Sequence, residues 1–130
     1  MNKPKKIIYK NQEEIHDKII DFINSKLTDD VKEAYLFGSA VTKEFGEYIE
    51  EYESHKGSDI DLMVIMPNNK IPKSWKYLNT EKRWWKLYRI DKININRTNH
   101  ILDVIIVKDG KEDYAKKRIK ELEWDVERLK

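Results

Sequence analysis

The sequence predicts an α/β or α+β domain in which one small mixed sheet is flanked by helices. Two segments with apolar residues at helical spacing lie toward the two ends of the chain. Between them, short apolar runs stop at turn-forming residues, as strands do. The third observation is length, because 130 residues suffice for one core that buries roughly two thirds of the unfolded surface. We therefore expect residues 1–130 to form a single domain.

The first half of the chain predicts one helix and two strands. Residues 11–27 carry isoleucines at helical spacing and acidic residues in the first turn, where the helix dipole favours them. The runs VKEAYLFG (31–38) and SDIDLMVIM (58–66) are short and apolar, which is typical of strands covered on both faces. Between these strands, the acidic and aromatic residues 44–57 predict an exposed insertion loop with at most one helical turn.

The second half predicts a helix, a strand and a final helix. Residues 72–90 place several aromatic side chains near one helical face and begin with a proline, a favourable first helical residue. HILDVIIV (100–107) is the third predicted strand, and residues 111–130 repeat apolar positions every three or four residues. The predicted element order is αβαβαβα. Trp124 falls off the apolar stripe of the last predicted helix, and there it would indicate a protein partner.

Composition narrows the classes of partner. The formal charge is only +2 although 38% of the residues are charged, so a nucleic-acid partner is not expected. The absence of cysteine excludes disulfides and thiolate metal sites and fits a cytoplasmic protein. No stretch approaches the ~20 apolar residues of a membrane span, so we expect a soluble protein with no membrane contact. The composition does not decide whether the chain forms a homo-oligomer.

Three aspartates interrupt the predicted strands. Asp59 and Asp61 are two residues apart and therefore face the same side of a strand, while Asp103 interrupts the next apolar run. If these strands are neighbours, the three carboxylates converge, and such oxygen ligands favour Mg²⁺, with two ions when a nucleotide is bound. The alternatives are surface carboxylates on an edge strand for Asp59 and Asp61, and a lysine-paired charge for Asp103.

A glycine turn lies upstream of the aspartates. Gly38 and Ser39 follow the first predicted strand, where a glycine lets backbone amides approach anionic oxygens. Alone this is weak evidence, because turns use both residues routinely.

Together, LFGSA, GSDIDLMVI and LDVIIV resemble the nucleotidyltransferase superfamily that includes DNA polymerase beta, specifically its minimal, antitoxin-like domains. The resemblance implies a nucleotidyltransferase fold, a triphosphate held at Gly38 and Ser39 with Ser58 alongside, and metal binding and catalysis by Asp59, Asp61 and Asp103. Where the family usually has an arginine after the Gly-Ser pair, this chain has Thr42, followed by Lys43 as a candidate phosphate ligand.

The implied reaction is Mg²⁺-dependent transfer of a nucleoside monophosphate, AMP in the first instance, from ATP or another nucleoside triphosphate to a hydroxyl acceptor. The acceptor could be a partner protein. The alternative is an antitoxin-like binding module that neutralises a small helical toxin of the HEPN type, with little or no catalysis. The chain alone does not choose between an enzyme and such a module.

Overall fold

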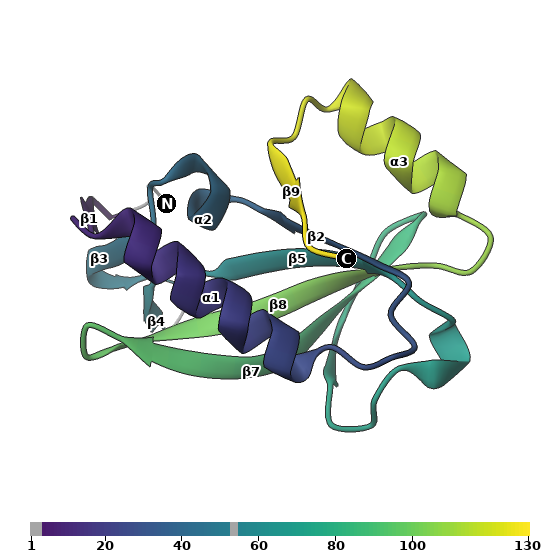
Figure 1. Cartoon of the computed structure of the whole chain (residues 1–130), viewed down its shortest axis with the longest axis horizontal. Coiled ribbons are helices and arrows are strands. Elements are labelled where there is room, and N and C mark those ends of the chain that lie inside the picture. Colours follow the sequence, from purple (N-terminus) through teal and green to yellow (C-terminus); the bar gives the residue numbers. More distant parts are fainter. Residues whose placement is uncertain (1–3, 53–54) are drawn as a thin grey trace.

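The computed structural model describes residues 4–52 and 55–130, which form a mixed α+β fold. Within these ranges there are three α-helices and two sheets (Figure 1). The helices are α1 (Gln12–Lys26), α2 (Ser39–Thr42) and α3 (Glu112–Glu121), with a 3₁₀ turn η1 (Asn68–Lys70). The strands are β1 (Lys6–Ile8), β2 (Glu33–Phe37), β3 (Gly46–Tyr52), β4 (His55–Gly57), β5 (Ile60–Ile65), β6 (Lys76–Glu81), β7 (Trp85–Ile95), β8 (Thr98–Val107) and β9 (Val126–Arg128).

The main sheet has six strands in the order β6-β7-β8-β5-β2-β9. The β5–β8 pair is parallel, and the other described pairs in this sheet are antiparallel. The three apolar runs of the sequence form β2, β5 and β8, which lie side by side in the middle of this sheet. The predictions of three strands and of a small mixed sheet flanked by helices are therefore confirmed.

Helices α1 and α3 cover opposite faces of the main sheet. The buried isoleucines of α1 pack with Leu36 and Leu62, whereas Ala115 and Ile119 of α3 pack with Tyr35 and Met63. Because adjacent strand residues point to opposite faces, these two clusters must lie on the two sides of β2 and β5. Figure 1 shows α1 crossing in front of the strands and α3 set apart at the upper right.

The segment predicted as an exposed insertion loop is instead part of a second sheet, in the order β1-β3-β4. Phe45, fully buried, belongs to the same core cluster as Leu62 and anchors this sheet to the main one. β3 also finds a partner in β1, from a segment for which the sequence predicted no element. Residues 53–54 of the predicted loop lie outside the described residues.

The helix predicted over residues 72–90 is wrong. β6 and β7 pair there as an antiparallel hairpin, and β7 then pairs with β8 along its whole length. The aromatic side chains that fit a helical spacing also fit strands, where aromatic residues are favoured. Because β7 adds a long ladder of hydrogen bonds to β8, tertiary pairing decides between the two conformations.

The last predicted helix is too long. α3 ends at Glu121, and Glu123 adopts a left-handed backbone conformation with φ of 56° that turns the chain. The following residues form β9, which pairs with β2. The predicted order αβαβαβα therefore fails at both of these places. No helix in the described ranges has the length and apolar character needed to span a membrane.

Candidate active site

A row of side chains crosses the main sheet on the face against which α3 packs. Phe37 on β2 is the register partner of Asp61 on β5, and Asp61 is the partner of Asp103 on β8. Asp103 in turn is the partner of Arg89 on β7. Register partners in neighbouring strands share a face, so these four side chains lie on one side of the sheet. We call the three polar members, Asp61, Asp103 and Arg89, the polar row, and Phe37 lies at one end of it.

Arg89 supplies a positive charge to the row. Its Nε donates to Asp103 Oδ1 at 3.0 Å and its Nη2 donates to Oδ2 at 3.4 Å. This hydrogen bonding raises the pKa of Arg89, and the negative charges of Asp103 and of Asp59 act in the same direction against partial burial. The charge of Asp59 therefore acts on the same guanidinium as the charge of Asp103.

The two alternatives for these aspartates have different outcomes. β5 is an interior strand, so an edge-strand position is wrong for Asp61, whereas Asp59 lies just before β5. The alternative for Asp103 is correct in kind, because the carboxylate is paired, but its partner is an arginine. The side chain of Asp103 is only 14% exposed, which explains why a charge there needs a partner.

Gly38 forms the turn between β2 and α2, and no other residue fits there. Its backbone has φ of 79° and ψ of −155°, a region that essentially only glycine adopts. A Cβ at this position would lie 2.7 Å from Asp61 Oδ2. The Gly38 carbonyl accepts hydrogen bonds from the amides of Val41 and Thr42, which starts α2 immediately after the turn. The glycine turn and the polar row are therefore in contact.

An open pocket of about 340 Å³ lies over this contact. We call it the turn pocket. It is lined by Phe37, Gly38, Thr42, Asp61, Trp124 and Asp125. Strand β2, the turn, β5 and the segment before β9 each contribute to it, so residues far apart in sequence meet here.

The sequence of residues 17–119 matches the family model described as polymerase beta, nucleotidyltransferase. The chain belongs to this family. No curated protein matches the sequence.

The polymerase beta nucleotidyltransferase family typically uses Mg²⁺ and a nucleoside triphosphate, so we tested whether the polar row suits a hard cation. Asp61 and Asp103 offer carboxylate oxygens from register partners on one face, and such oxygens are ligands that Mg²⁺ prefers. Within residues 4–52 and 55–130, however, no three carboxylate or histidine side chains are grouped closely enough to hold a metal ion as they stand. The carboxylates of Asp61 and Asp103 are chemically suited to Mg²⁺. In this structure the positive charge beside Asp103 is the guanidinium of Arg89.

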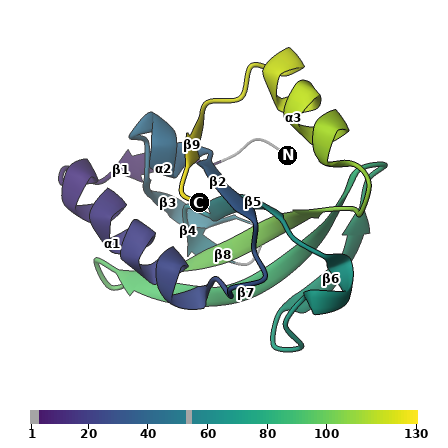
Figure 2. The ribbon, with the colours of Figure 1, turned by 45° about the vertical axis from the view of Figure 1, so that its right-hand side comes forward.

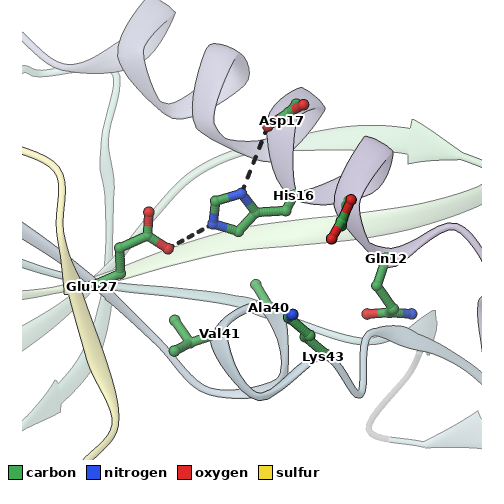
Figure 3. Close-up of a pocket in the computed structure, with 8 residues that line it drawn as sticks. Gln12, His16, Asp17, Ala40, Val41, Lys43 and Glu127 are labelled. Carbon is green, nitrogen blue, oxygen red and sulfur yellow. Dashed lines mark hydrogen bonds and ion pairs between the residues drawn. The ribbon is translucent and has the colours of Figure 1, made fainter.

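Lys43, the other candidate phosphate ligand, lies in a different pocket. It ends α2 in a left-handed conformation and lines a cavity of about 300 Å³ between α1, α2 and β9. We call this cavity the helix pocket. Figure 3 shows Lys43 and His16 lining it, with His16 Nε2 2.6 Å from Glu127 Oε1. Thr42, by contrast, lines the turn pocket together with Asp61.

Ser58 is buried. It is 2% exposed, and its Oγ accepts a hydrogen bond from the Gly46 amide at 3.1 Å. Its carbonyl accepts from Nδ1 of His100, which is fully buried. Ser58 therefore connects β3 and β8 through its side chain and its backbone carbonyl, and its proposed contact with a nucleotide stays a prediction.

Sequence reasoning missed Arg89, Phe37, Trp124 and Asp125 as site residues. Arg89 was hidden because its segment was predicted to be a helix, although an arginine among alternating apolar residues is the same kind of signal as Asp103. Trp124 was placed on the wrong element. The Phe37 and Asp125 positions carry no signal in the sequence alone, because only strand register and the turn before β9 bring them to the pocket.

Proposed function

We propose that the chain is a Mg²⁺-dependent nucleotidyltransferase that transfers AMP, or another nucleoside monophosphate, from a nucleoside triphosphate to a hydroxyl acceptor. The observation that carries this proposal is the contact between the Gly38 turn and the polar row, under one open pocket. Family membership supports the reaction class. The identity of the nucleotide and of the acceptor belongs to the proposal.

Each residue has a role in this proposal. The backbone at Gly38 and Ser39 binds the triphosphate, and Asp59, Asp61 and Asp103 are the ligands for Mg²⁺, which neutralises phosphate charge when bound. The acceptor oxygen forms a bond to the α-phosphorus while the bond from that phosphorus to the β-bridging oxygen breaks, and pyrophosphate leaves. Asp103 accepts the proton of the hydroxyl. Catalysis then consists mainly of positioning and charge neutralisation.

The test is transfer of label from ATP labelled at the α-phosphate. The purified chain is incubated with Mg²⁺ and with a HEPN-type protein as the candidate acceptor, and labelled protein is counted. We expect Asp61→Asn to reduce transfer by about a hundredfold or more, because a ligand for the Mg²⁺ that neutralises the phosphates is lost. Asp113→Asn, an exposed carboxylate on α3, serves as the matched control and should transfer like the wild type.

A second candidate function is an antitoxin-like binding module for a HEPN-type toxin. The observation that favours it is the pair of exposed isoleucines Ile7 on β1 and Ile49 on β3, which lie on one face of the paired strands, since exposed apolar patches mark interaction surfaces. Ile7 is 53% exposed and Ile49 50%. Two results together would support the module and contradict the transferase. The wild type and Asp61→Asn would bind a HEPN-type toxin equally tightly, and the wild type would transfer no label.

A further inference from the structure

We propose that Trp124 and Asp125 recognise the base of the nucleotide and favour a base with an amino group at the purine 6-position or the pyrimidine 4-position. This inference rests on the proposed function, because it assumes that the triphosphate lies at the Gly38 turn. It adds a specificity-determining pair from the segment between α3 and β9, which lies beyond the residues matched to the family model.

The position of the two residues is the first argument. Trp124 and Asp125 line the turn pocket together with Gly38 and Asp61. If the phosphates of a nucleotide contact the Gly38 turn, its sugar and base lie within one nucleotide length of that turn. In the turn pocket, the wall that offers a large aromatic surface is formed by Phe37 and Trp124.

The rigidity of that wall is the second argument. The rings of Phe37 and Trp124 are stacked, with centroids 4.9 Å apart and planes inclined by 21°. Trp84, which is 7% exposed, supports Trp124 from within the core at 6.4 Å. An indole held in this way can contact a base without losing much conformational freedom, and every base has a face that can stack. Trp124 is half-buried, and it lines both the turn pocket and a neighbouring hollow beside α3.

The chemistry of Asp125 is the third argument. An ionised carboxylate only accepts hydrogen bonds, so it can pair with an amino group of adenine or cytosine and cannot pair with a carbonyl at the same position. Asp125 is exposed, and it lies next to Trp124 in the chain. A base stacked on Trp124 would therefore present its edge to the carboxylate of Asp125, which accepts hydrogen bonds. Adenine and cytosine are favoured over hypoxanthine and uracil on this basis.

The experiment measures equilibrium binding of four nucleotides to the full chain with MgCl₂ and without an acceptor. ATP and ITP differ at the purine 6-position, and CTP and UTP differ at the pyrimidine 4-position. We expect the wild type to bind ATP more tightly than ITP, and CTP more tightly than UTP, by about tenfold. Asp125→Asn should remove this preference, because its amide can donate to a carbonyl. Asp113→Asn is the control and should keep the preference.

Trp124 is tested with two variants, because it also packs against the core. Trp124→Leu should raise the dissociation constant for ATP by about tenfold, and Trp124→Phe, which keeps a stacking ring, should recover most of that loss. Thermal unfolding of both variants checks that they fold. If Trp124→Leu folds and binds ATP like the wild type, the aromatic wall does not contact the base.

The outcomes also separate this inference from the proposed function. Equal binding of ATP and ITP by the wild type, or a preference that Asp125→Asn leaves intact, overturns the inference while nucleotide binding stands. Binding of none of the four nucleotides overturns both. Tight binding with a base preference that follows Asp125, but no transfer to any acceptor, supports the inference and contradicts the transferase.

Discussion

At the scale of single residues, Arg89 explains how the chain tolerates carboxylates inside a sheet. Asp103 is nearly buried and Asp61 is its register partner, so their charges would repel each other at close range. The guanidinium of Arg89 bonds to Asp103 and is influenced by Asp59. Under the proposed function, a divalent cation bound at the polar row would also neutralise these carboxylates, and it would then compete with Arg89 for Asp103.

This competition predicts the effect of Arg89→Gln. Without metal, the variant should be less stable than the wild type by about 0.5–1 kcal/mol, since the arginine is partly exposed and the pair is screened. Adding MgCl₂ should raise the melting temperature of the variant more than that of the wild type, because the cation replaces the lost charge. Thermal unfolding with and without Mg²⁺ measures both effects. Arg97→Gln, an exposed arginine in the β7–β8 turn, should show neither. Equal responses of Arg89→Gln and wild type to Mg²⁺ would contradict this account.

Gly38→Ala is predicted to be more harmful than Gly110→Ala. Both glycines have positive φ, 79° and 80°, so both substitutions strain the backbone, and Gly38, with ψ of −155°, lies in a region that essentially only glycine adopts. Only at Gly38 does the new methyl group meet Asp61, whereas nothing lies within 4 Å of a Cβ at Gly110. Urea unfolding should therefore show a larger loss of stability for Gly38→Ala, and nucleotide binding should be lost in that variant alone. Equal losses of stability would mean that Asp61 moves aside at no cost.

At the scale of elements, Glu33 connects β2 to helix α3 and strand β9. Its carboxylate accepts hydrogen bonds from Lys116 Nζ of α3 at 2.8 Å and from the hydroxyl of Tyr35, and it lies 3.5 Å from Arg128 Nη2 of β9. The side chain is 16% exposed. The hydrogen bond from Lys116, followed by that from Tyr35, lowers the pKa of Glu33. α3 and β9 are thus held by one anion, and β9 follows the segment that carries Trp124.

This lowered pKa predicts a loss of stability in acid. Glu33 contributes fully above the ordinary pKa of 4.5, and its contribution disappears as the pH falls through the lower value of the folded state. Glu33→Gln should therefore be less stable than the wild type by about 1 kcal/mol at pH 7, and the difference should vanish in acid. Urea unfolding between pH 7 and pH 3 measures it. Glu81→Gln, whose carboxylate is 48% exposed beside Lys108, should change stability little at any pH.

The elements that could be predicted from sequence are those whose local pattern fits either a helix or a strand, but not both. The continuous apolar runs of β2, β5 and β8 are too short for helices, and the isoleucine spacing of α1 fits no strand. Residues 72–90 and 122–130 have patterns that fit both conformations. There the outcome depends on a partner strand, β8 or β2, which the local sequence does not reveal.

At the scale of the whole molecule, the core has two parts on the two faces of the main sheet. Ile19 of α1 is fully buried in the larger part, while its neighbour Ile20 is only partly buried. Ile19→Ala should lower the free energy of unfolding by about 2–4 kcal/mol through the lost contacts and the cavity left behind. Ile20→Ala is the matched control and should lower it by clearly less. Similar values in urea unfolding would mean that α1 is not anchored through this face.

The sequence could predict the acidic half of the candidate site but not its surroundings. Asp61 and Asp103 stand out because charges interrupt apolar strands, and the Gly38 turn stands out because it follows one. Arg89, Phe37 and Trp124 reach the same region only through strand register and the turn at Glu123, which depend on the complete fold.

The pairing of β5 with β8 has a consequence for synthesis. Asp61 and its partner Asp103 are separated by the whole β6–β7 hairpin, so a ribosome exposes the first long before the second exists. Until β8 has emerged, β5 is an interior strand with an open edge and a carboxylate lacking its final neighbours. Nascent chains halted within β7 should therefore be the ones that depend on chaperones and that proteases degrade first.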